Sequence, residues 1–145
     1  MSFKTDAEAG DPRYKSKVVE RPDTTTYDGL KSNLAVTVWS GAYDPIAIIR
    51  NEELVLLKAE ANIGKGGDGL TEINIVRAAH KLDAATTGGI DQLLHEKRYS
   101  LFMEGHRWVD MRRYGKTATL PNDRSDRGDQ VFDSFPLPEA ETKGK

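Results

Sequence analysis

The feature that most limits how this chain can fold is a long stretch of helical periodicity over residues 51–114. Apolar side chains recur there at the spacing of one face of an α-helix, and glycines or capping residues divide the stretch into segments. Asn51 is a good N-cap, the two glutamates after it suit the positive end of a helix, and Gly64 marks the end of this segment. The sequence therefore predicts a mainly α-helical fold.

Three more helices are expected in this region, over about 70–80, from Asp91 onward and in a short stretch around Trp108. Helix pairs that begin near Asn51 and Ile90, about forty residues apart, resemble the stacked units of a tetratricopeptide-like superhelix. Such units bury their faces against neighbours, and about three are needed for stability. Two pairs therefore predict exposed apolar surface on the isolated chain.

The two ends of the chain differ in texture from the helical region. Residues 1–50 form a loop-rich segment in which Leu34–Trp39 is the clear β-like run, so a short strand or hairpin at most is expected there. Residues 115–145 contain prolines and mixed charges and predict a loop-rich tail. The expected organisation is thus a loop-rich segment, helical repeats over 51–114 and a tail.

The composition excludes several classes of protein. The chain of 145 residues has 21 basic and 23 acidic side chains, a formal net charge of −2, which argues against a nucleic-acid partner. No apolar run approaches the ~20 residues of a membrane-spanning helix. Without cysteine the chain has no disulfide, thiolate zinc site or cysteine nucleophile. The first residues lack the apolar core of a signal peptide, so either the protein stays where it is made or its true N-terminus lies upstream.

Several motif-like strings are better explained as ordinary structure. The run 64–69 fits G-x-G-x-x-G, but a helix precedes it where a dinucleotide site needs a strand, which predicts an interhelical turn. The Arg-Gly-Asp tripeptide within 126–129 lies among carboxylates without calcium-loop spacing, which predicts a solvated loop. The histidines are scattered, and His95 and Glu96 are expected on the exposed face of their helix. Neither a metal nor a cofactor is expected.

Lys97 and Glu104 are seven residues apart, which places them on nearly the same side of a continuous helix. We expect them to form a structural ion pair in a helix interface. A glycoside hydrolase that uses Glu104 in a carboxylate pair is the weakest interpretation, because no convergent second carboxylate is visible. No catalytic residue is therefore expected.

Two aromatic residues of the N-terminal segment are the candidate ligand-binding residues. Trp39 and Tyr43 are separated by Ser-Gly-Ala in a loop-rich stretch. Aromatic faces stack on the apolar faces of sugar rings, and binding residues are often carried on loops. The alternative is that both rings cover the helical core.

Ordered motifs along most of the chain resemble the SusD/RagB family. Residues 93–116, LLHEKRYSLFMEGHRWVDMRRYGK, are similar to the family's E-R-R-x-E-L-x-x-E-G-x-R-x-x-D-L-R-R segment, although Lys97, Tyr99 and Ser100 depart from it. The chain also contains, in family order, counterparts of four further family motifs. Two are helical, P-x-x-x-R-x-x-E and I-N-x-V-R, and two lie near the ends of the matched region, D-P-R and F-P-I-P-x-x-E. The residues that carry the resemblance are Arg50, Glu53, Glu60, Arg77, Glu104, Gly105, Arg107, Trp108, Asp110, Arg112 and Arg113.

The resemblance implies a protein built on tetratricopeptide-like repeats and anchored by lipid to the outer-membrane surface of Bacteroidetes-type bacteria. Such proteins bind glycans or other nutrients and deliver them, without catalysis, to a TonB-dependent (SusC-like) transporter. The family is several times longer than this chain and carries its lipidated cysteine upstream, so the expectation is a C-terminal portion. The shared motifs look like scaffold signatures, and no family binding residue is carried over. A tetratricopeptide-like protein-interaction module is the alternative.

Overall fold

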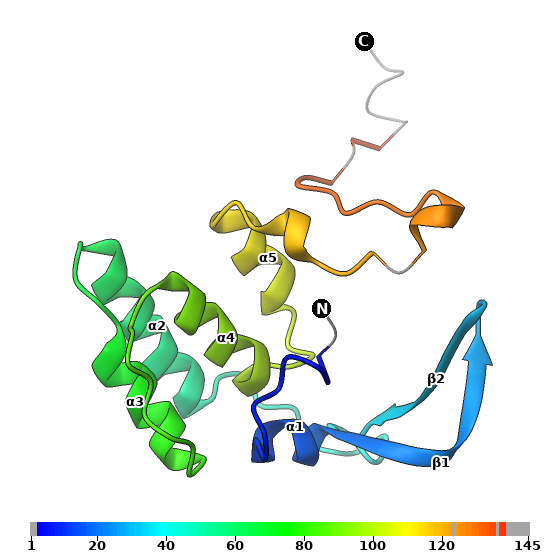
Figure 1. The fold of residues 1–145 in the computed structure, drawn as a ribbon, viewed down its shortest axis with the longest axis horizontal. Coiled ribbons are helices and arrows are strands. Elements are labelled where there is room, and N and C mark those ends of the chain that lie inside the picture. Colours follow the sequence, from blue (N-terminus) through cyan, green and yellow to red (C-terminus); the bar gives the residue numbers. More distant parts are fainter. Residues whose placement is uncertain (1–2, 123, 136, 139–145) are drawn as a thin grey trace.

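A computed structural model, which describes residues 3–122, 124–135 and 137–138, gives five α-helices and a two-stranded antiparallel hairpin within those residues (Figure 1). The elements follow the order α1 (Pro12–Lys17), β1 (Val18–Tyr27), β2 (Leu30–Val36), α2 (Asn51–Gly64), α3 (Leu70–Ala79), α4 (Ile90–Ser100) and α5 (His106–Arg113). Short 3-10 turns follow at Thr117–Thr119 and Ser125–Arg127. None of the helices described is both long enough and apolar enough to cross a membrane.

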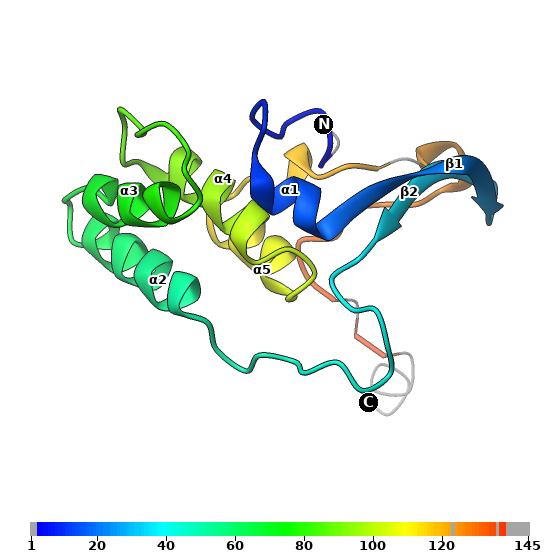
Figure 2. The same ribbon diagram turned by 90° about the horizontal axis from the view of Figure 1, so that it is seen from below.

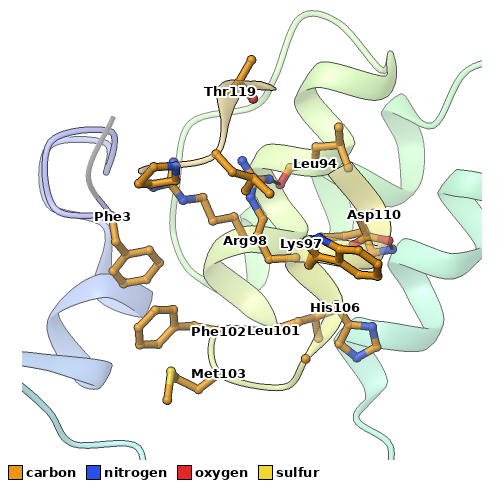
Figure 3. Close-up of a pocket in the computed structure, with 15 residues that line it drawn as sticks. Phe3, Leu94, Lys97, Arg98, Leu101, Phe102, Met103, His106, Asp110 and Thr119 are labelled. Carbon is orange, nitrogen blue, oxygen red and sulfur yellow. Dashed lines mark hydrogen bonds and ion pairs between the residues drawn. The ribbon is translucent and has the colours of Figure 1, made fainter. Parts of the chain in front are cut away.

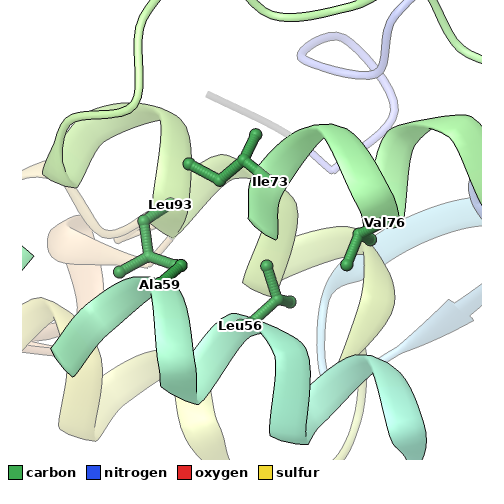
Figure 4. Packing of buried hydrophobic residues seen from close by; sticks show 5 residues of the cluster. All are labelled: Leu56, Ala59, Ile73, Val76 and Leu93. Atoms are coloured by element: carbon green, nitrogen blue, oxygen red, sulfur yellow. The ribbon is translucent and has the colours of Figure 1, made fainter. Parts of the chain in front are cut away.

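The helical body forms where helix α2 packs against both α3 and α4. Its core is a cluster of small and branched apolar side chains from the three helices, shown in Figure 4: Leu56, Ala59, Ile73, Val76 and Leu93. The four helices α2 to α5 lie where the periodicity predicts them. One detail differs at the start of α2, where Arg50 is the N-cap and Asn51 is already helical. The Arg50 side chain makes no capping hydrogen bond and instead contacts Ser100 and Glu104.

The N-terminal segment is more ordered than its composition suggests. Helix α1 begins after Asp11, whose side chain accepts a hydrogen bond from the Arg13 backbone N–H at 2.8 Å, and Pro12 suits the first helical position. Strands β1 and β2 form an antiparallel hairpin through Asp28 and Gly29, whose positive φ angles of 48° and 78° match a two-residue hairpin turn.

The sequence prediction was wrong on one point in this segment and incomplete on another. The expected strand Leu34–Trp39 is shifted, since β2 ends at Val36, and helix α1 was not predicted. The hairpin projects away from helices α2 and α3 (Figure 1). Its tip is joined to the C-terminal tail by ion pairs from Arg124 and Arg127 to Asp28.

The segment between β2 and α2 runs along one edge of the molecule in an extended course (Figure 2). Its side chains are largely exposed: Tyr43 by 100%, Ile46 by 74%, Ile48 by 94% and Ile49 by 61%. Exposed apolar side chains at this density are unusual for a surface that faces only water. This part of the exposed apolar surface lies on an extended segment, and not on the faces of the helix pairs where the sequence predicts it.

Candidate functional site

The predicted ligand residues Trp39 and Tyr43 lie on a tight turn that precedes helix α2. Asp44 builds the turn, because its carboxylate accepts hydrogen bonds from the backbone N–H groups of Ser40 and Gly41, the latter at 3.0 Å. The same bonds, led by that from Ser40, hold the pKa of the Asp44 carboxyl below its ordinary value. Trp39 is 40% exposed and Tyr43 fully exposed, so both rings offer a face to solvent and Tyr43 does not cover the helical core.

The carboxylate of Glu96 lies at the centre of a buried charge cluster between α1, α3 and α4, here called the Glu96 network. Arg13 donates to it at 2.5 Å and Arg77 at 2.7 Å, and all three side chains are at most 5% exposed. Asp11 and Glu8 bind the outer faces of Arg13 and Arg77 at 2.8 and 2.6 Å. The expectation that Glu96 is surface-exposed was therefore wrong, since α1 and α3 cover the polar face of α4.

A second cluster, the Lys97 network, joins α2, α4 and α5. The Lys97 ammonium lies 2.7 Å from Asp110 and 3.1 Å from Glu60, and Glu60 also accepts from Arg113 and the Tyr114 hydroxyl at 2.7 Å. Burial alone would raise the pKa of Glu60, but the hydrogen bonds from Tyr114, Arg113 and Lys97 hold it below its ordinary value. Burial and the bond to Glu60 raise the pKa of Tyr114 to about 12. The network ties the three helices together through charge.

The predicted pair between Lys97 and Glu104 was wrong, because Glu104 pairs with Arg50 instead. The Arg50 guanidinium also donates to the Ser100 carbonyl oxygen at the end of α4. Lys17 donates to that oxygen at 2.7 Å as well, so two cations stabilise this helix terminus. Burial, followed by the charge of Arg50, lowers the pKa of Lys17 to about 8.

Two groups of side chains have the chemistry and spacing to hold a metal ion, and arginines already engage both. In each group three ligand atoms lie within 4.8 Å of one another: Glu8 with His95 and Glu96, and Glu53 with Glu104 and His106. Arg77 contacts both carboxylates of the first group, and Arg50 contacts Glu104 of the second. Because a guanidinium opposes a further positive charge, both groups are better described as ion-pair clusters.

The tryptophan of the E-G-x-R-W string anchors the C-terminal tail. The Trp108 Nε1–H donates to the Phe132 carbonyl oxygen at 2.8 Å, and the Arg112 guanidinium lies 5.7 Å from the Trp108 ring centroid. Gly105 in the same string has a φ of +81° and is the N-cap of α5. These two motif residues therefore have structural contacts, at the tail and at the start of α5.

Replacing Gly105 with alanine should destabilise the chain by about 1–2 kcal/mol, because a left-handed backbone is unfavourable for a residue with a Cβ. No atom lies within 4 Å of the position of that Cβ, so the effect isolates the backbone conformation. Gly64→Ala, at an equally open position at the end of α2, is the matched control and should be neutral or slightly stabilising. Urea unfolding of both variants, followed by circular dichroism, gives the comparison; equal effects would contradict the prediction.

A cavity that sequence reasoning missed lies between α4, α5, Phe3 near the N-terminus and the segment 119–121 after α5 (Figure 3). It has a volume of about 420 Å³ and mostly apolar walls. Its aromatic wall comes from Phe3, Phe102 and Trp108, and its cationic lining includes Arg98 and Arg107. No residue of the 37–50 segment lines it. The one signal in the sequence is the E-G-x-R-W string, which supplies part of its wall.

The other strings singled out in the sequence behave as ordinary structure. The run 64–69 closes α2 and leads into α3, as an interhelical turn should. The Arg-Gly-Asp tripeptide within 126–129 lies in an exposed 3-10 turn and its following loop.

Comparison with known proteins identifies similar sequences. The sequence model of the SusD family matches residues 6–144. SusD-like protein P38 from Formosa agariphila is 30% identical over 131 residues, which cover 79% of this chain and 26% of that protein. The chain thus spans about a quarter of the length of the curated relative it matches. No solved structure gives a significant match.

Proposed function

The chain belongs to the SusD family, and we propose from this that it takes part in non-catalytic capture of a glycan or other nutrient at the bacterial outer-membrane surface. In this proposal the chain is part of a longer surface lipoprotein. The captured ligand passes to a TonB-dependent, SusC-like transporter. No cofactor and no catalytic residue takes part.

The observation that best supports ligand capture by this chain is the aromatic pair on the turn before α2. Tyr43 is fully exposed and Trp39 is 40% exposed, and the hydrogen bonds to Asp44 fix the turn between them. A turn fixed in this way reduces the entropy lost when a ligand binds. Trp39 and Tyr43 are therefore the proposed stacking platform for a sugar ring.

Replacing Trp39 or Tyr43 with alanine should weaken glycan binding by about tenfold, since an aromatic contact contributes roughly 1 kcal/mol or more. Isothermal titration of the chain against a panel of neutral and acidic oligosaccharides measures the effect. Tyr27→Ala is the matched control, because Tyr27 is 87% exposed on the hairpin and lies outside the platform. Unchanged affinity in both platform variants would contradict their assignment, and no binding to any glycan would contradict ligand capture by this chain.

A second function, docking of a protein partner, is favoured by the exposed apolar segment. Ile46, Ile48 and Ile49 follow Tyr43 along this extended segment and are each more than half exposed. Such a run suits contact with a protein surface. In this alternative helices α2 to α4 form part of a tetratricopeptide-like superhelix whose faces recognise a partner. It predicts capture of a protein partner that Ile48→Asp abolishes, without affinity for sugars.

A further inference from the structure

The cavity between α4 and α5 has the walls of a binding site for a ring-shaped ligand. Phe3 and Phe102 stack on each other with centroids 4.0 Å apart and form one side, as Figure 3 shows. Trp108 contributes a further aromatic surface, and the polar part of the lining includes Lys97, Arg98, Arg107 and Asp110. Aromatic walls with a few polar groups are typical of small-molecule sites.

Arg107 is a half-buried cation at this cavity without an acidic partner. Its guanidinium donates to the Leu94 carbonyl oxygen at 3.2 Å and, within the described part of the chain, has no carboxylate at ion-pair distance. Burial, followed by the charge of Arg98, lowers the pKa of Arg107, whereas the charges of Asp110 and Asp6 oppose that shift. A partly buried cation without an acidic partner is less favourable than a paired one, and a ligand anion would supply that partner.

The acidic groups near Arg107 are already engaged with other cations. Asp110 lies 2.7 Å from Lys97, and Asp6 lies 2.5 Å from Arg98. The first turn of α5, which contains Arg107, lines the cavity too, and its N-cap makes no side-chain hydrogen bond. Free backbone N–H groups at a helix N-terminus attract negative charge. A guanidinium without an acidic partner and the first turn of α5 thus both line this cavity.

We propose that this cavity binds an acidic sugar unit, with its carboxylate or sulfate group against Arg107 and its ring against the aromatic wall. The proposal rests on the glycan-binding function above and adds a ligand class to it: an oligosaccharide that contains uronic acid or sulfated residues. The site is separate from the Trp39 and Tyr43 platform. An arginine is suited to both anions because its planar fork pairs with two oxygen atoms at once.

The test is isothermal titration of the 145-residue chain with matched neutral, uronic-acid and sulfated oligosaccharides. Arg107→Gln should weaken binding of an acidic oligosaccharide by about tenfold to a hundredfold, the range of a charge-assisted hydrogen bond, and leave neutral ligands unaffected. Arg127→Gln, which removes an exposed arginine of the tail, is the matched control and should leave the affinity for acidic and neutral oligosaccharides unchanged. Circular dichroism checks that each variant is folded.

A measurement on the unmodified chain supplements the variants. Raising the salt concentration from about 50 to 500 mM should weaken binding of acidic but not of neutral oligosaccharides, because salt screens charge. Equal affinity for matched acidic and neutral ligands would overturn the acidic site and leave glycan capture intact. Absence of binding to every glycan would overturn both. Preference for one of the two acidic ligands identifies the anion that the site accepts and supports the proposal.

Discussion

Replacing Glu96 with alanine is expected to destabilise the chain by about 3–5 kcal/mol, a large share of the roughly 5–15 kcal/mol of a typical domain. The carboxylate is fully buried and binds Arg13 and Arg77 at 2.5 and 2.7 Å, so its removal leaves two buried guanidinium groups undercompensated. The expected result in urea unfolding, followed by circular dichroism, is a much lower transition midpoint or loss of the cooperative transition.

The control for this prediction is Glu20→Ala on strand β1. Glu20 also pairs with a cation, Lys4, but its side chain is 54% exposed, and exposed pairs contribute less than about 1 kcal/mol. The double variant Glu96→Ala/Arg77→Met should lose less free energy of unfolding than the two single variants lose together, because the arginine that would be left unpaired is also removed. A cost for Glu96→Ala no larger than that for Glu20→Ala would show that the Glu96 network does not hold α1, α3 and α4 together.

The helical region was predictable because its signals are local. Apolar spacing and the glycines near Gly64 and Gly89 reflect the geometry of single helices, and those helices form where expected. The burial of Glu96 could not be predicted in the same way. It lies on the polar side of α4, and only the long-range approach of Arg13 from α1 makes that side an interior. A buried charge is recognisable only with its partner, and this partner is far away in the sequence.

Two other differences from the sequence prediction have identifiable physical causes. The hairpin has a local signal in Asp28 and Gly29, the residue pair that favours a two-residue turn, but weak alternation in the strands obscured it. Strand β1 is interrupted by an irregularity in pairing between Glu20 and Thr25, which breaks the period of two. The loop position of Trp39 and Tyr43 followed from composition, and their role in binding stays a prediction.

The cavity could not be foreseen from the sequence because separate segments assemble it. Phe3 comes from the N-terminus, Arg98 from α4, Trp108 from α5 and Leu120 from the tail. No spacing rule joins these positions. The motif residues, in contrast, were found by resemblance, and the structure supplies the physical reason for several of them: Arg77, Glu60 and Asp110 are buried members of the two charge networks.

Replacing Lys97 with methionine is expected to destabilise the chain by about 3–5 kcal/mol, because Asp110 then loses its ammonium partner in a buried position. Glu60 keeps its bonds to Arg113 and Tyr114, so most of the expected loss of stability comes from the unpaired Asp110 carboxylate. Lys4→Met is the matched control: Lys4 pairs with Glu20 and both side chains are about half exposed, so its loss should cost less than about 1 kcal/mol. Chemical denaturation of both variants, followed by circular dichroism, measures the difference.

A double-mutant cycle separates the two possible partners of Lys97. Helix α4 ends at Ser100 and Met103 has a φ of +67°, so Glu104 no longer lies on the helix face that the spacing from Lys97 assumes. Coupling between Lys97→Met and Asp110→Asn should therefore fall between about 0.5 and 3 kcal/mol, and coupling with Glu104→Gln should be near zero. If the larger coupling were to Glu104, a continuous helix through residue 104 would describe the chain better, and the Lys97 network would be wrong.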